Sequence, residues 1–189
     1  MKKLMKRLTA LLLAGVLMMT MTACRKEYTS GEVVGDTYTN EWAEVKVTVP
    51  SGYKMLDTSS AGRAPSGFDM GAVFVADASV TIPACYVLTR QGEADIEEIG
   101  ESFTQEFGGT SGMMNVSQGG TTYQVTITKS YYTIAGESYL CFHLGVSVAD
   151  VYCAFRDVDG TGVIAICVVT MNGYGTDDED AIFDMFEKT

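Results

Sequence analysis

The chain has 189 residues, of which 47% are hydrophobic and 20% are charged, with 13 Lys and Arg against 24 Asp and Glu. The length suits one domain, and the composition excludes a disordered, fibrous or multi-span membrane protein. Basic residues are concentrated in a leader that we expect to be removed, so the mature chain is more acidic than the formal net charge of −11 indicates. Phosphates repel such an acidic body, which excludes nucleic acid as a partner.

The N-terminal segment has the three parts of a secretory signal. A stretch rich in Lys and Arg at residues 2–7 precedes an apolar run from Leu8 to Ala23, and small residues lead to Cys24. The apolar run is shorter than the roughly 20 residues that a spanning helix needs. An export signal is therefore favoured over a permanent transmembrane helix.

The residues Met21, Thr22, Ala23 and Cys24 resemble the lipobox of bacterial lipoproteins, although Met21 stands where that family usually has Leu or Val. The resemblance implies that the Cys24 thiol receives a diacylglyceryl group, with fatty chains such as palmitate, and becomes the N-terminus. Two acyl chains give a stable anchor. We therefore expect a signal peptide at 1–23 and a protein held on the extracytoplasmic face of the cell membrane.

The segment after the lipobox is rich in Thr, Ser, Gly, Glu and Asp and shows no apolar periodicity. Such a composition is typical of a tether that does not fold. We expect residues 24–40 to be the lipidated cysteine with a flexible tether, and residues 41–189 to be the folded domain.

The first half of the domain predicts short strands and one helix. Apolar residues alternate with polar ones at 45–49, and apolar runs at 71–76 and 85–89 are further strand candidates. Apolar residues recur at intervals of three and four over 93–107, which predicts an amphipathic helix. The Gly- and Ser-rich residues that follow, as far as Gly120, predict a flexible loop.

The second half of the domain predicts a series of strands. Their ranges are 121–132, 138–146, 150–157 and 162–171, and their short connections join antiparallel neighbours. Thr176 and Glu179 then form a capping box, which predicts a closing helix with an apolar face of Ala181, Ile182, Met185 and Phe186. The fold class is α+β, with a single twisted antiparallel sheet of about six or seven strands and two packed helices.

The order of elements over about 40–188 resembles the PsbP-like domains of small bacterial lipoproteins. The likeness lies in Trp42 ahead of the residues from Val45 to Lys54, in the middle helix, in the residues from Ile134 to Tyr139, in the hairpin at Asp157 to Gly160, and in the closing acidic helix. Plant members of the family are photosystem II subunits, but no photosystem docking or manganese-related residue matches here. The resemblance implies a non-enzymatic binding or assembly module.

The four cysteines after Cys24, namely Cys85, Cys141, Cys153 and Cys167, lie in apolar surroundings without a C-x-x-C motif. Cys153 and Cys167 are the nearest candidates for a disulfide. A turn centred on Asp159 and Gly160 places residue 153 opposite 166, so that these two cysteines face opposite sides of the sheet. Buried free thiols are favoured, and a bridge requires a shifted register.

Catalytic chemistry is not indicated. His143 is the sole histidine, and arrangements with Cys141, Cys153 or Asp150 are formally possible. No nucleophile elbow accompanies them, so His143 is interpreted as a structural residue of a strand. We expect no catalytic residues, no enzyme activity and no cofactor.

The best suggestion of a metal site is Asp157 and Asp159 before Gly160, because alternating carboxylates resemble the opening of a calcium loop. The later ligands of such a loop are missing. Asp-Gly is also a strong hairpin signal, so a turn is favoured. A calcium-responsive module remains the third functional hypothesis.

A pair of methionines and a set of tyrosines suggest contact surfaces and no specific chemistry. Met113 and Met114 form an adaptable apolar patch if the loop is exposed. Tyrosines crowd the C-terminal half at 123, 131, 132, 139, 152 and 174, and strand propensity explains them better than a glycan or protein surface does. The sequence does not single out binding residues.

The leading hypothesis is a membrane-tethered extracytoplasmic lipoprotein that acts as a non-catalytic binding or assembly module. Its partners are the membrane, through Cys24, and an unknown envelope protein or glycan. The alternative is a carboxylate-based hydrolase of cell-wall or glycan material, which requires two carboxylates about 5 to 9 Å apart in one cleft.

Overall fold

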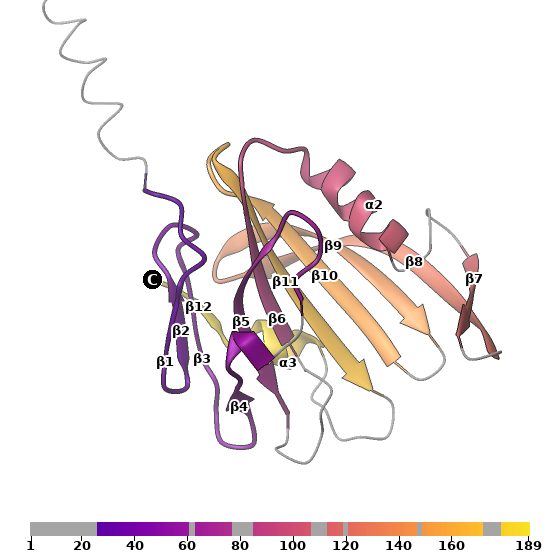
Figure 1. The fold of residues 1–189 in the computed structure, drawn as a ribbon, viewed down its shortest axis with the longest axis horizontal. Coiled ribbons are helices and arrows are strands. Elements are labelled where there is room, and N and C mark those ends of the chain that lie inside the picture. The colour runs from indigo at the N-terminus through magenta and orange to yellow at the C-terminus, as the bar shows by residue number, and fades with distance from the viewer. Residues whose placement is uncertain are drawn as a thin grey trace, which may run out of the picture.

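The computed structural model describes residues 26–60, 63–76, 85–106, 113–118, 121–146, 149–171 and 179–189. These residues form an α+β fold whose antiparallel strands belong to two sheets, as Figure 1 shows. The prediction of a single sheet was therefore wrong, although the fold class and the two helices were confirmed. No helix in these ranges is long and apolar enough to cross a membrane.

The large sheet has the strand order β4-β5-β6-β11-β10-β9-β8-β7. Its strands are β4 (Lys54–Met55), β5 (Asp69–Val75), β6 (Cys85–Gln91), β7 (Met113–Gln118), β8 (Thr121–Ile134), β9 (Glu137–Val146), β10 (Ala149–Asp157) and β11 (Gly162–Met171). A short 3-10 helix, Thr58–Ser60, follows β4. The predicted strands of the second half were confirmed, whereas β7 replaces part of the predicted flexible loop because it pairs along β8.

The β10–β11 connection contains one residue more than a two-residue hairpin. Asp159 and Gly160 have φ angles of 50° and 64°, and the Thr161 amide donates to the Val158 carbonyl at 2.9 Å, as in a type I′ turn. The Val158 amide then donates to the Gly162 carbonyl at 2.8 Å, so Thr161 is an extra residue that bulges from the ladder. The bulge moves the register by one residue from the prediction and places Cys153 opposite Cys167.

Helix α2 (Ile96–Glu106) lies against one face of the large sheet, over β9 and β10 (Figure 1). Asp95 begins it, because one carboxylate oxygen accepts from the Glu97 amide at 2.8 Å. Phe103 points into the sheet, with its ring 5.5 Å from that of Phe155. Gly100 allows this close packing, since a Cβ there would lie 2.1 Å from the Phe142 ring.

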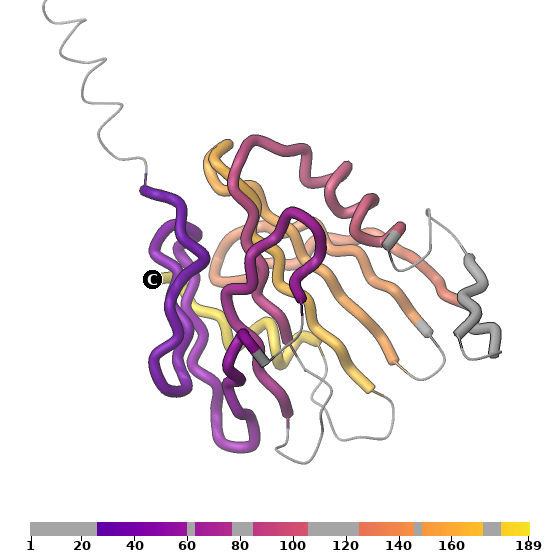
Figure 2. Tube along the Cα trace, viewed as in Figure 1, coloured from indigo at the N-terminus to yellow at the C-terminus, as the bar shows by residue number. Residues whose placement is uncertain are grey.

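The small sheet has the order β1-β2-β3-β12. Its strands are β1 (Glu32–Val34), β2 (Thr37–Asn40), β3 (Val45–Thr48) and β12 (Phe186–Lys188). The two ends of the described chain thus lie side by side, as the indigo and yellow segments of Figure 2 show. Together with helix α3 (Glu179–Phe183), this sheet covers the face of the large sheet opposite α2.

Two predicted boundaries were wrong in this region. Residues 32–40 form a hairpin in place of a flexible tether, because Tyr38 and Asn40 are fully buried and the Tyr38 hydroxyl donates to the Ser30 carbonyl at 2.8 Å. The closing helix ends at Phe183, and Phe186 belongs to β12, which pairs with β3. Thr176 of the predicted capping box lies outside the described residues.

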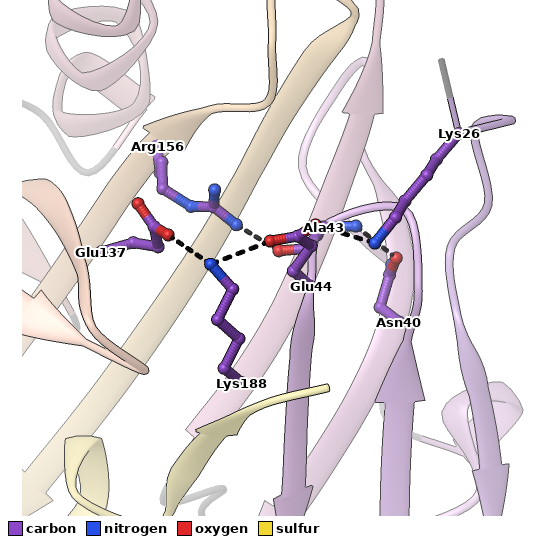
Figure 3. Close-up of polar contacts among 7 residues, drawn as sticks. All are labelled: Lys26, Asn40, Ala43, Glu44, Glu137, Arg156 and Lys188. Carbon is purple, nitrogen blue, oxygen red and sulfur yellow. Dashed lines mark hydrogen bonds and ion pairs between the residues drawn. The ribbon is translucent and has the colours of Figure 1, made fainter. Parts of the chain in front are cut away.

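A group of charged side chains joins the two sheets, as Figure 3 shows. The Glu44 carboxylate accepts from Lys26 at 2.8 Å and from Lys188 at 3.1 Å. Lys188, on β12, also reaches the carboxylate of Glu137, on β9, at 2.9 Å. The two lysines hold the pKa of Glu44 at about 2, well below its ordinary value of 4.5. Lys188 therefore links the small sheet to the large one through Glu137, and its pair with Glu44 joins β12 to the β2–β3 turn within the small sheet.

Arg156 makes a second link between the sheets (Figure 3). Its guanidinium, on β10, donates to the carbonyl of Ala43 in the turn between β2 and β3. The same guanidinium lies 5.3 Å from the centre of the Tyr139 ring. The Asn40 side chain accepts from the Ala43 amide at 2.9 Å and holds this turn in place.

Glu44→Gln should make the protein less sensitive to acid. Because the folded-state pKa of Glu44 is lowered, its contribution to stability is complete above about pH 4.5 and is lost as the pH falls toward about 2. The variant should therefore be less stable than the wild type at pH 6, and the difference should shrink as the pH falls to 3. Urea midpoints at both pH values measure this.

The matched control is Glu41→Gln, which removes the same charge from an exposed position in the same turn. It should leave the urea midpoint at pH 6 close to that of the wild type. Equal pH dependence of the wild type and of Glu44→Gln would contradict a structural role for the Glu44 ion pairs.

Candidate functional site

A pocket with a volume of about 280 Å³ opens on the α2 side of the large sheet, and we call it the α2 pocket. Its lining comes from the segment before β5, from strands β5, β6, β10 and β11, and from α2. The lining residues are Arg63, Pro65, Met70, Tyr86, Leu88, Phe103, Val151, Cys153, Cys167 and Val169. Most of these side chains are apolar, so the pocket suits an apolar ligand.

The floor of the α2 pocket follows from strand register. Tyr86 on β6 lies opposite Cys167 on β11, which lies opposite Cys153 on β10. Directly opposite residues of antiparallel strands face the same side, so the three side chains form one row across the sheet. Phe103 of α2 forms part of the wall, and its ring lies 6.3 Å from that of Phe68.

The α2 pocket carries one positive side chain and no carboxylate among the described residues that line it. Arg63 is exposed to solvent. Burial raises the pKa of the Tyr86 hydroxyl, and burial together with the neighbouring Cys167 thiol raises the pKa of Cys153. The Tyr86 hydroxyl and the Cys153 thiol therefore stay neutral at pH 7, which leaves Arg63 as the one charged side chain in the described lining. This arrangement favours an apolar ligand with an anionic group.

A second pocket, of about 320 Å³, adjoins the α2 pocket and shares Pro65 and Phe103 with it. Glu93, Asp95 and Glu98 line it. All three carboxylates come from the short stretch at the start of α2, and Asp95 is engaged in capping the helix. The acidic wall is therefore accounted for by a helix N-terminus, where negative side chains are stabilising.

His143 lies in a polar cluster on the opposite face of the large sheet. One ring nitrogen lies 2.7 Å from an Asp150 oxygen, and the other lies 3.4 Å from the Thr128 hydroxyl. The ring stacks on Tyr152 with centroids 4.3 Å apart and an angle of 6°. Burial raises the pKa of the nearby Cys141 thiol to about 12. These groups stand on the regular strands β8, β9 and β10, and the structural role of His143 stays a prediction.

The predicted metal candidates form a turn. An Asp157 carboxylate oxygen accepts from the Gly160 amide at 2.9 Å, and Asp159 occupies the left-handed turn position. Within the described ranges, no three His, Cys, Asp or Glu side chains are grouped as metal ligands.

The other sequence-predicted residues are scattered or lie outside the described residues. Cys24 and Tyr174 lie outside them, and Met113 and Met114 belong to the edge strand β7. Tyr139 is buried in the core, whereas Tyr131 is 74% exposed. Sequence reasoning did not find the α2 pocket. The alternation of the strands could have indicated the pocket, because Tyr86 and Leu88 on one strand, and Val151 and Cys153 on another, point to one face of the sheet. The predicted register, however, placed Cys167 on the opposite face.

Comparison with known proteins gives no functional relative. No protein-family model matches the chain, and no curated protein matches it. A solved structure from Bacteroides thetaiotaomicron VPI-5482 aligns with 82% of the chain at 8% sequence identity, with a TM-score of 0.34. The chain spans 48% of that protein's length.

Asp157→Ala should destabilise the β10–β11 hairpin by about 0.5 to 1 kcal/mol, because it removes the acceptor of the Gly160 amide. Calcium should leave the melting temperature of both proteins unchanged, since Asp157 is engaged in the turn. Thermal unfolding with and without calcium measures both effects.

Asp159→Asn is the control, because it removes a neighbouring carboxylate while Asn tolerates a positive φ. Its melting temperature should equal that of the wild type. A rise in the wild-type melting temperature with calcium, abolished by Asp159→Asn, would reinstate the calcium hypothesis.

Proposed function

We propose that this protein is a lipoprotein, tethered through Cys24 to the extracytoplasmic face of the cell membrane, that acts as a non-catalytic binding module. The lipobox resemblance and the acidic composition support the location. The α2 pocket is the observation that carries the binding role, because it is an apolar hollow without a carboxylate in its described lining. A PsbP-like domain over about 40–188 belongs to the same proposal.

The ligand we propose for the α2 pocket is a small apolar acid. A cavity of about 150 Å³ admits a benzene ring, so the volume of about 280 Å³ suits an aromatic ring or a short acyl chain with a polar group. Arg63 provides the complementary positive charge for a carboxylate. Arg63 is exposed, so its contribution to affinity is modest.

Carboxylate-based hydrolysis is less well supported. Glycoside hydrolysis needs two carboxyl groups on either side of the scissile bond. The acidic side chains of the second pocket, Glu93, Asp95 and Glu98, lie within six consecutive residues, and Asp95 caps α2. This placement favours binding over hydrolysis.

Cys24→Ala should abolish membrane attachment. In cells given labelled palmitate, the wild-type protein should carry the label and sediment with membranes, whereas the variant should carry no label. Gel fluorography and mass spectrometry of the N-terminal peptide measure this. Cys85→Ala, a matched change at a buried cysteine, should keep the label. A wild-type chain with a free Cys24 thiol and an intact leader would refute the anchor.

Phenylacetate should bind the α2 pocket more tightly than phenylacetamide, which has the same ring without the charge. Arg63→Gln should weaken phenylacetate binding by about twofold to fivefold and leave phenylacetamide binding unchanged. Titration followed by nuclear magnetic resonance shifts gives both affinities and locates the affected residues.

Lys54→Gln is the matched control, because Lys54 is an exposed basic residue on the edge strand β4, outside the pocket lining. It should bind phenylacetate as the wild type does. Equal loss in both variants would indicate a general charge effect, and shifts confined to residues outside the pocket would refute this site.

A further inference from the structure

Two cysteine side chains meet on the floor of the α2 pocket. Cys153 of β10 and Cys167 of β11 are direct partners in the antiparallel ladder and face the same side. Cys153 is 0% exposed and Cys167 is 4% exposed, and both line the pocket. Burial, and after it the neighbouring Cys167 thiol, raises the pKa of Cys153, which fits two thiols that lie beside each other.

The hydrogen-bond pattern makes this pair suitable for a covalent bond. The Val158 amide donates to the Gly162 carbonyl, so residues 158 and 162 form a hydrogen-bonded pair of the β10–β11 ladder. On the other side of β11, the Gly92 amide donates to the Thr161 carbonyl, just before the strand begins. Because bonded and non-bonded pairs alternate along antiparallel strands, Cys153 and Cys167 form a non-hydrogen-bonded pair. Such pairs have Cα atoms about 4.5 Å apart, within the range of disulfides.

We propose that Cys153 and Cys167 are a disulfide-forming site, which reacts through the α2 pocket with a low-molecular-weight disulfide. The product is neutral, which suits the apolar surroundings better than a thiolate does. This inference does not depend on ligand binding or on the membrane anchor, so those proposals and this one fail separately.

The reaction proceeds by two exchanges. The Cys167 thiol, which is the more exposed, loses its proton and attacks one sulfur of the external disulfide. The other half leaves as a thiolate and takes up a proton. Cys153 then loses its proton and attacks the Cys167 sulfur, which expels the second half as a thiol. Two electrons pass from the protein to the external disulfide, and two small thiols are released.

Cys85 and Cys141 provide internal controls. They are also buried thiols, but they belong to the core cluster on the opposite face of the sheet. Burial raises the pKa of each. Cys85 lies opposite Val168 and Phe74, and Cys141 lies opposite Ala154 and Ser130, so neither has a cysteine as its direct partner.

The test treats the native full chain with bis(2-hydroxyethyl) disulfide, stops the reaction with acid, and alkylates the remaining thiols after unfolding. Tryptic cleavage after Lys129 and Arg156 leaves Cys153 and Cys167 on different peptides. Mass spectrometry should find these peptides joined through Cys153 and Cys167, at least tenfold faster than any adduct forms on Cys85 or Cys141. The double variant Cys85→Ala/Cys141→Ala should form the same bond.

Two single variants test the order of attack. Cys153→Ala should accumulate the mixed disulfide on Cys167, because no resolving thiol remains. Cys167→Ala should leave Cys153 unmodified, because Cys153 is fully buried. A native chain that keeps both thiols free, or a bond that includes Cys85 or Cys141, would overturn the proposed site. Rapid adduct formation on Cys153 in Cys167→Ala would overturn the order of attack.

Discussion

The position of Thr161 is the constraint on which the arrangement of the large sheet depends. As the extra residue after the Asp159–Gly160 turn, it shifts the pairing of β11 by one residue relative to a simple hairpin. It also connects the layers, because its hydroxyl accepts from the Trp42 indole at 2.9 Å and its carbonyl accepts from the Gly92 amide at 2.9 Å. A one-residue shift exchanges the two faces of a strand. Thr161 therefore determines which residues of β11 face α2 and which face the small sheet.

The two faces of β11 contribute to different cores. Ile164, Ile166 and Val168 pack toward the small sheet and α3, whereas Val163, Ala165 and Cys167 pack toward α2. Two contacts hold the small sheet against the large one: the ion pair of Lys188 with Glu137, and the hydrogen bond of Arg156 to the Ala43 carbonyl in the β2–β3 turn. Residues 32–40 form strands β1 and β2 of the folded domain, so they do not serve as the tether that their polar composition suggested.

The chemistry of the domain is divided between its faces. The side with α2 has an apolar pocket with two thiols on its floor and an arginine at its edge. The opposite side has the polar His143 cluster, in which the imidazole ring stacks on Tyr152. We proposed binding on the basis of this division, because the pocket is lined mostly by apolar side chains whereas the His143 cluster lies on regular strands.

Much of the fold was predictable from the sequence where a polar and an apolar face alternate. The helix α2, the strands of the second half and the turn at Asp159 followed from periodicity and turn chemistry, and lay close to their observed bounds. Of the small sheet, the alternation at 45–49 predicted β3, whereas β1, β2 and β12 were missed because they are short. In the β1–β2 ladder, Val33 and Tyr38 are the one directly paired set of apolar residues that indicates the buried side. Strand β12 depends on pairing with β3, which is distant in the sequence.

By itself, the sequence determined the acidic composition and the α+β class, because charge and local periodicity can be counted among neighbouring residues. Export and lipidation are predictions from the leader pattern. Only the tertiary structure decided the α2 pocket and the meeting of Cys153 with Cys167. Strand β11 is apolar on both faces, so its sequence carries no polar mark of orientation. The bulged residue, Thr161, fixes which face of β11 points toward α2, and it does so only once β11 pairs with β10.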